Sequence, residues 1–185
     1  MTTPRTLYLI ACAAPPARRI ATGIRAAQST GWDVCLILTP SAHRWAEEED
    51  PGELDELREL TGHPVRHRYK LPSESDILPA PDALLVAPLT FNTTNKWAGG
   101  HADTLALGLL TEGLGLNLPI VALPYLNNAQ AAHPVFDLSV EFLRAQGVRV
   151  LLGGDGFTPH PPKHGNLDAY PWASAMAALP AESAN

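Results

Sequence analysis

The chain has 185 residues, of which 45% are hydrophobic and 17% charged, and this composition excludes wholesale disorder and fibrous architectures. A formal net charge of −6 without any basic stripe excludes the electrostatic footprint of a nucleic-acid-binding protein. No apolar run reaches the roughly 18 residues that a spanning helix needs, and the start, MTTPR, lacks a secretory pattern, so we expect a cytoplasmic protein without membrane contact.

Short apolar runs alternate with helical patterns along the first 155 residues. Buried strands are predicted at 7–13, 34–38, 83–87, 120–123 and 148–152, and a short edge strand at 65–71. Helical spacing of apolar residues is found at 18–28, 53–60, 93–110 and 136–146. Because strands that alternate with helices form a parallel sheet covered on both faces, the sequence predicts an open, three-layer α/β domain.

The last part of the chain differs in composition. Residues 156–185 are rich in proline, and we expect a C-terminal tail that packs on the single domain 1–155 or on a neighbouring subunit. Cys12 and Cys35 lie in apolar runs outside any CxxC pair, which predicts buried thiols without a disulfide. No metal site is predicted, because the tail residues His160, His164 and Asp168 are too widely spaced.

Small or polar residues follow the first two predicted strands, where open parallel sheets bind their ligands. Ala13 and Ala14 precede a helix whose backbone N–H groups suit a phosphate, although the loop lacks GxGxxG and P-loop motifs and by itself is typical of a plain turn. Thr39 and Ser41 also suit a phosphate, and the same residues are typical of a helix start.

The next two strand ends carry more polar groups. The segment from Pro88 reads PLTFNTTNKWAGGHADTL and brings together Thr90, Asn92, Thr93, Thr94 and Asn95. Turns and caps need one or two such residues, so this number indicates a ligand rich in hydrogen-bonding edges. The segment PYLNNAQAAHP begins at Pro124, and its amides Asn127 and Gln130 suit a carboxylate or an amide.

These two segments carry a family resemblance. The pattern PAxANTxxKxAxGxxDxL is matched at Pro88, Asn92, Thr93, Lys96, Ala98, Gly100, Asp103 and Leu105, and PxMNxxM is echoed at Pro124, Leu126, Asn127 and Gln130. Over about residues 5–155 the chain resembles the homo-oligomeric flavin-containing cysteine decarboxylase family. That group includes peptidyl-cysteine decarboxylases, phosphopantothenoylcysteine decarboxylase and flavin prenyltransferase.

The resemblance implies a Rossmann-like, flavodoxin-type fold, homotrimers or dodecamers built of trimers, and FMN bound where subunits meet. It implies that Thr39 and Ser41 hold the phosphate and that Thr90, Asn92 and Thr93 line the flavin. The whole implied FMN site comprises Ala13, Ala14, Thr39, Ser41, Pro88, Thr90, Asn92, Thr93 and Asp103. The implied reaction is oxidation of a substrate thiol to a thioaldehyde followed by loss of the carboxylate. The implied substrate is a small molecule or a peptide with a C-terminal carboxylate, which Asn127 would hold.

The chain departs from the family at the expected base. The decarboxylases carry a histidine about eight residues before the Ala-Asp that opens the third strand; here that position is Glu74, before Pro81-Asp82. We predict His67 as the catalytic histidine, with 71–79 as an inserted loop, and leave His101, Glu74 or no base as alternatives. The late cysteine of the phosphopantothenoylcysteine enzymes and the Gly-Ala-Ser-Gly loop of the prenyltransferase are missing, so neither activity is expected. An FMN-binding protein without decarboxylase activity and an oxidoreductase on the same fold remain open.

Overall fold

The computed structural model describes residues 4–181 and contains a parallel sheet of five strands in the order β2-β1-β3-β4-β5. The strands are β1 (Arg5–Ala11), β2 (Trp32–Leu38), β3 (Ala83–Leu89), β4 (Ile120–Pro124) and β5 (Arg149–Val150). Leu9 in β1, which lies between β2 and β3, is opposite Leu36 of β2 and Leu85 of β3, and all three are fully buried. Burial on both faces explains the continuous apolar runs. The predicted α/β fold of flavodoxin type is confirmed.

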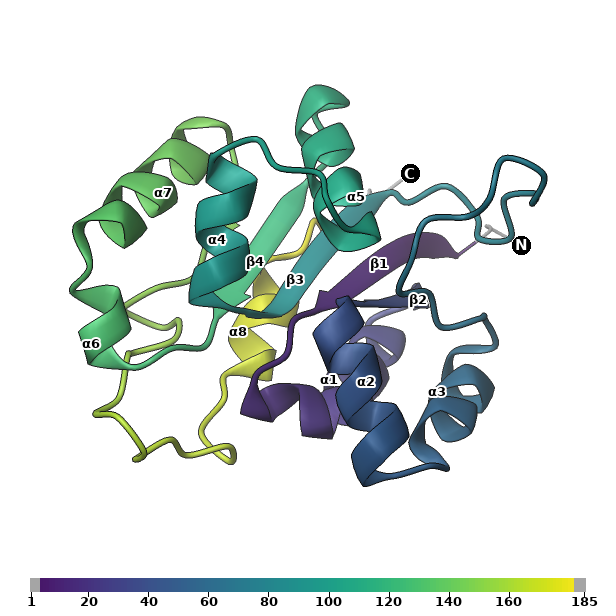
Figure 1. Cartoon of the computed structure of the whole chain (residues 1–185), viewed down its shortest axis with the longest axis horizontal. Helices are drawn as coiled ribbons and strands as arrows, with labels where there is room; N and C mark the ends of the chain where they lie inside the picture. The colour runs from purple at the N-terminus through teal and green to yellow at the C-terminus, as the bar shows by residue number, and fades with distance from the viewer. Residues whose placement is uncertain (1–3, 182–185) are drawn as a thin grey trace.

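Helices cover both faces of this sheet (Figure 1). They are η1 (Pro15–Arg19), α1 (Ile20–Ser29), α2 (Pro40–Glu49), α3 (Glu53–Thr61), α4 (Phe91–Ala98), α5 (Leu105–Gly115), α6 (Asn128–Ala131), α7 (Pro134–Ala145) and α8 (Trp172–Ala178). Helix α1 packs against both α3 and α8, and α4 packs against both α5 and α7. Because each of the strands β1 to β4 is followed by a helix, these four strands deliver their carboxyl ends and helix starts to the same edge.

Three predicted elements are corrected. The expected edge strand at 65–71 is wrong, because only Arg66 pairs with β2, through a single bridge to Ile37, before the chain leaves the sheet. The expected helix at 93–110 is two helices, α4 and α5, since Gly100 has a φ of +76°, which ends the helical path. The last strand is shorter than predicted, because Leu152 pairs with Phe157 across the turn at Gly153 and Gly154 and does not continue along β4.

The tail packs on the same chain. The ring of Trp172 lies so close to Gly23 of α1 that a Cβ there would fall 2.4 Å from a ring carbon. The Tyr170 hydroxyl donates to the Leu123 carbonyl (2.8 Å), and Arg5 donates to the Pro180 carbonyl (3.0 Å). The end of the tail at Pro180 therefore lies beside the start of β1. The division into a domain 1–155 and a tail stays a prediction.

Two further expectations concern the chain as a whole. Cys12 and Cys35 are buried and free, as predicted. Between residues 4 and 181, no helix has the length and apolar character needed to cross a membrane. The cytoplasmic location stays a prediction.

Candidate functional site

A cavity of about 590 Å³ lies at the carboxyl edge of the sheet. Its walls come from the segments that follow β1, β2, β3 and β4 and from one residue of the tail. The lining comprises Cys12, Ala13, Ala14, Pro15, Thr39, Pro40, Ser41, Thr90, Phe91, Asn92, Thr93, Lys96, Thr104, Leu107, Tyr125, Leu126, Asn127, Gln130 and His160. The volume is in the ordinary range for a small-molecule site.

Most of the residues singled out in the sequence meet in this one cavity: Ala13, Ala14, Thr39, Ser41, Thr90, Asn92, Thr93 and Asn127. Pro88 and Asp103 do not line it, but each contacts a residue that does. The Pro88 carbonyl accepts a hydrogen bond from the Cys12 backbone N–H (3.0 Å), and Asp103 forms an ion pair with Lys96.

The first turn of α4 supplies one wall. Thr90 is the N-cap, and its Oγ1 accepts from the Thr93 N–H (3.3 Å), while Thr94 Oγ1 donates back to the Thr90 carbonyl (2.8 Å). The helix start therefore uses its threonines for capping. The exposed side chain of Asn92 takes no part in that cap and lines the cavity beside the positive end of the helix.

The starts of η1 and α2 supply the opposite wall. Thr39 is the N-cap of α2 and its Oγ1 accepts from the Ala42 N–H (3.4 Å), which leaves the exposed Ser41 hydroxyl available at the helix start. In the first loop, the Ala14 N–H donates to the Cys12 carbonyl (2.8 Å), and Pro15 has no N–H. The first loop therefore provides room for a ligand rather than a series of backbone N–H donors.

Among the described residues that line the cavity, only Lys96 has a permanently charged side chain. The hydrogen bond from Lys96 holds the pKa of the Asp103 carboxyl below its usual range. Burial raises the pKa of the Cys12 thiol, although hydrogen bonds with Thr93 and Thr90 oppose this shift. Cys12 is therefore a protonated thiol at neutral pH.

Asn127 has a structural role that the sequence motif did not reveal. It caps the short helix α6: its Oδ1 accepts from the Gln130 N–H (2.9 Å), and Gln130 Oε1 accepts from the Asn127 N–H (3.4 Å). This reciprocal pair is a capping box. It uses the Asn127 oxygen and leaves the amide NH₂ as a donor at the cavity.

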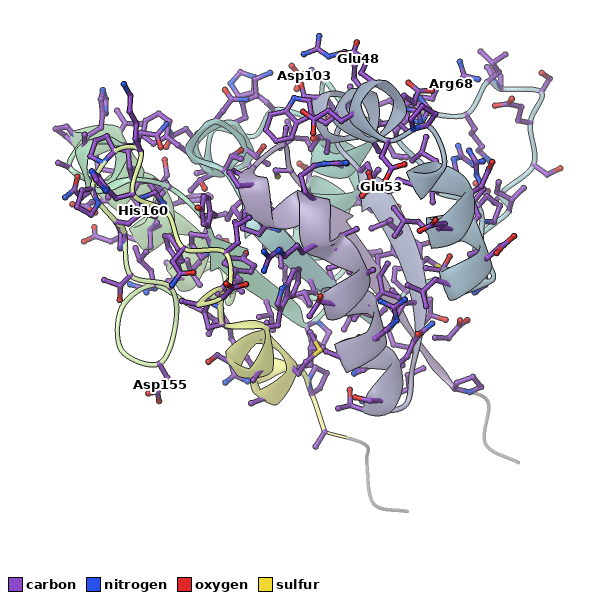
Figure 2. The ribbon with its side chains drawn as sticks, turned by 90° about the horizontal axis from the view of Figure 1, so that it is seen from below. Glu48, Glu53, Arg68, Asp103, Asp155 and His160 are labelled. Carbon is purple, nitrogen blue, oxygen red and sulfur yellow. The ribbon has the colours of Figure 1, made fainter. Side chains whose placement is uncertain are left out.

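The three candidate bases lie outside this cavity in the single chain. His67 stacks on His43 of α2, with ring centroids 3.5 Å apart, and lines a second cavity of about 450 Å³ together with Glu74. His101 is exposed in the link between α4 and α5. His67 lies away from the cavity because the chain at Arg66 runs along the outer side of β2. Figure 2 shows Arg68, the next residue, and the tail residue His160 toward opposite sides of the molecule.

Several lining residues were missed. Lys96 belongs to the matched motif, and Tyr125 belongs to the segment after the fourth strand, so both were within reach of sequence reasoning. His160 was not, because its place depends on a backbone bridge to Asn127 and a hydrogen bond from the Asn128 N–H to the His160 carbonyl (2.9 Å). No local pattern encodes a contact across that distance in the chain.

Solved structures share this fold. The FMN-dependent cysteine decarboxylase TvaF from thioviridamide biosynthesis is 26% identical, with a TM-score of 0.61 over 79% of this chain and 88% of that one. The cypemycin decarboxylase CypD is 18% identical, with a TM-score of 0.67 over 94% and 90%. A dodecameric FMN-dependent UbiX-like decarboxylase from Escherichia coli O157:H7 is 16% identical, with a TM-score of 0.69 over 93% and 92%.

Sequence comparison agrees with the structural likeness. A cysteine/cysteine sulfinic acid decarboxylase from an unknown prokaryotic organism is 33% identical over 75 residues, which are 40% of this chain and only 20% of that protein's length. The model of the Flavoprotein family matches residues 3–171, and so extends into the tail. Because this match spans nearly the whole chain, the chain belongs to the Flavoprotein family.

Proposed function

We propose that this protein is an FMN-binding, decarboxylase-like enzyme that oxidatively decarboxylates a cysteine-containing or related carboxylate substrate. The observation that carries the proposal is the convergence of eight predicted residues on one cavity, namely Ala13, Ala14, Thr39, Ser41, Thr90, Asn92, Thr93 and Asn127. The FMN-dependent cysteine decarboxylase TvaF among the structural relatives supports the choice of reaction.

The chemistry of the lining fits FMN. Ser41 and Thr39 offer hydroxyl groups at the start of the ten-residue helix α2, where an anionic phosphate is favoured. Asn92 offers an amide for a ring edge with both donors and acceptors. Phe91 and Leu126 give the apolar surface that a flat ring system needs.

Within this proposal the side chains bind and orient the substrate. When bound, FMN supplies the electron acceptor that no side chain provides. The Asn127 NH₂ donates a hydrogen bond to the substrate carboxylate, since its oxygen is held in the cap. Lys96, held by Asp103, adds a positive charge to the same cavity and favours an anionic ligand.

The first experiment is to purify the full chain, record its visible absorption spectrum and identify any released chromophore by mass spectrometry. We expect a flavin spectrum and the mass of FMN. Release of CO₂ is then measured from a peptide with a C-terminal cysteine and, as the matched control, the same peptide with a C-terminal serine. A colourless protein that also fails to bind added FMN would contradict the proposal.

A second candidate is an FMN-binding protein without decarboxylase activity. It is favoured by one observation, the absence of His67, Glu74 and His101 from the lining of the cavity in the described part of the chain. The two candidates differ in one result. The enzyme releases CO₂ from the cysteine peptide and loses this activity in Asn127→Asp, whereas the binding protein holds FMN and releases none.

We further propose a homotrimer, or a dodecamer of trimers, with FMN between subunits. The outer face of α7 supports self-association, because Val135, Leu138 and Phe142 recur at helical spacing and are 46%, 65% and 46% exposed. In such an assembly His67, which lies outside the cavity of its own chain, acts on the cavity of a neighbouring subunit. Light scattering after gel filtration tests this proposal, and a monomer would contradict it.

A further inference from the structure

Two amide side chains lie together on the wall that follows β4. Asn127 is the N-cap of α6, Gln130 is the third residue of that helix, and both line the cavity. The pattern PxMNxxM has a methionine at the place of Gln130, so this chain carries a polar side chain where the pattern has an apolar one. The start of α6 is also held from outside, because the Asn128 N–H donates to the His160 carbonyl (2.9 Å). Gln130 therefore adds a hydrogen-bonding group at a fixed place in the cavity.

The capping box fixes the orientation of both amides. A backbone N–H group needs an acceptor, so the Asn127 oxygen faces the Gln130 N–H (2.9 Å) and the Gln130 oxygen faces the Asn127 N–H (3.4 Å). The NH₂ group is then the free end of each amide. Neither NH₂ group donates a hydrogen bond to a residue between positions 4 and 181. Because Gln130 is exposed and Asn127 is half-buried, both groups remain available as donors to a ligand.

The charge of the cavity favours an anionic acceptor for these donors. The described lining contains the positive charge of Lys96 and no aspartate or glutamate. Asp103, which pairs with Lys96, is outside the lining. A hydrogen bond to an ionised acceptor is stronger than a bond to a neutral one. A carboxylate is therefore a better partner for two NH₂ groups than a neutral amide is.

The two amides are distant from the end of the cavity that suits a phosphate. Thr39 and Ser41 follow β2, whereas Asn127 and Gln130 follow β4, and β1 and β3 lie between those two strands. Neighbouring strands are about 4.8 Å apart, so three such steps separate the two strand ends by about 14 Å. Figure 1 shows α2 and α6 well apart from each other. A phosphate beside Ser41 therefore leaves both amides for a second anionic group.

We propose that Gln130 is a specificity-determining residue, and that its NH₂ group and the NH₂ group of Asn127 each donate a hydrogen bond to one oxygen of the substrate carboxylate. A free carboxylate offers two acceptor oxygens, whereas a C-terminal amide offers one oxygen and turns an NH₂ group toward a donor. The pair therefore selects substrates that end in a free carboxylate. This inference rests on the proposed function, since it takes the cavity to hold such a substrate.

The test compares two peptides that differ only in the C-terminal group. The FMN-loaded full chain is titrated, with calorimetric detection, with a peptide that ends in serine, either as the free acid or as the C-terminal amide. Serine has no thiol to oxidise, so binding is measured without turnover. We expect the wild-type protein to bind the free acid at least about tenfold more tightly than the amide.

Gln130→Glu separates recognition from capping. The new side chain keeps an oxygen for the Asn127 N–H, so the capping box is retained. It removes the NH₂ donor and adds a charge that repels a carboxylate, so the preference for the free acid should vanish while the amide peptide binds as before. Gln146→Glu is the matched control, because Gln146 is exposed and outside the cavity lining. It should keep the wild-type preference.

Gln130→Met is a second variant that adds no charge and introduces the methionine of the pattern. One donor, on Asn127, remains, so the preference should lie between that of the wild type and that of Gln130→Glu. A residue that only caps α6 would behave differently: Gln130→Glu would change neither affinity, and Gln130→Met would weaken both peptides alike. Equal affinity of the wild type for the two peptides, or an unchanged preference in both Gln130 variants, would overturn the inference.

These results separate the inference from the proposed function. A wild-type chain that takes up no FMN overturns both. A chain that takes up FMN and decarboxylates the cysteine peptide, but whose Gln130→Glu and Gln130→Met variants keep the preference for the free acid, overturns only the role of Gln130.

Discussion

Two segments that line the cavity are held in place by different means. The first turn of α4 is fixed locally, because Thr90 caps the helix and Thr94 bonds back to the Thr90 carbonyl. The tail segment that carries His160 is fixed by contacts with residues far away in the chain, such as Tyr170 with Leu123. One wall therefore forms with its own helix, while the other forms only when the tail docks.

This difference separates stability from ligand binding. On the α4 wall, Asn92 takes no part in the helix cap, so its side chain can be replaced without destabilising the start of the helix. On the tail wall, the position of His160 depends on contacts that other tail residues make with the domain, such as Tyr170 with Leu123. Changes that undock the tail should therefore cost much stability, and changes at the cavity surface should cost little.

The largest effect is expected for Trp172→Ala. Trp172 is only 8% exposed and its ring lies directly on Gly23. Removing a buried aromatic ring costs about 3–5 kcal/mol of the free energy of unfolding. Urea unfolding measures it, with the exposed Ala177→Ser on the same helix as a control that stays within about 0.5 kcal/mol. A loss no larger than that of the control would show that the tail is not docked as described.

The next effect tests the α4 wall. Asn92→Ala removes an amide that makes no cap bond, so the free energy of unfolding should stay within about 0.5 kcal/mol of the wild type. The affinity for FMN should fall about tenfold, because a ring edge loses its hydrogen-bond partner. Fluorescence titration of FMN measures this, and the Ala177→Ser variant serves again as the control. An unchanged affinity would remove Asn92 from the FMN site.

The same contrast explains which parts of the fold and of the site could be predicted from the sequence. The strands and the polar loops after them were predictable, because apolar runs mark buried parallel strands and a parallel sheet gathers its strand ends at one edge. That rule brought Thr39, Asn92 and Asn127 together although they are far apart in the sequence. The break between α4 and α5 was missed because a glycine pair within a helical pattern ends a helix only when the backbone takes a positive φ, as Gly100 does.

The rest depended on tertiary contacts. His67 was chosen for its distance from the third strand, but its direction is set by the bridge at Arg66 and by stacking on His43. His160 was considered only as a metal ligand, because its pairing with the loop at Asn127 has no local signature. Sequence spacing gives positions along the chain, whereas the side of the molecule that a loop residue faces is fixed by what it packs against.

A smaller effect distinguishes two roles of Asn127. Asn127→Ala removes the cap oxygen of α6 and should cost about 1 kcal/mol of unfolding free energy. Asn127→Asp keeps an oxygen for the Gln130 N–H and should keep that stability. It removes the NH₂ donor and adds a charge that repels a carboxylate, so CO₂ release should fall in both variants. Full activity in Asn127→Asp would leave Asn127 as a cap alone.

The smallest effect concerns His67, which was predicted to act at the cavity but lies outside it. Burial, then His43 and Arg68, lower the pKa of His67, while Glu47 opposes the shift. The unfolded chain therefore gains a proton on this histidine at a higher pH than the folded chain does. The contribution of the neutral His67 ring to the free energy of unfolding is fully present above about pH 6.5. It is lost as the pH falls through the range below that value.

His67→Asn removes this titration, so its free energy of unfolding should fall less steeply than that of the wild type between about pH 6.5 and 5. The difference should be smaller than the cap effect, because the ring is partly exposed and solvent screens its charge. Urea unfolding at several pH values measures the two slopes, with His164→Asn as the exposed control. Parallel curves for His67→Asn and the wild type would mean that stacking on His43 leaves the proton affinity of His67 unchanged. A flatter curve with unaltered FMN binding would mark the segment around His67 as a separate titrating region, held by α2 and independent of the cavity.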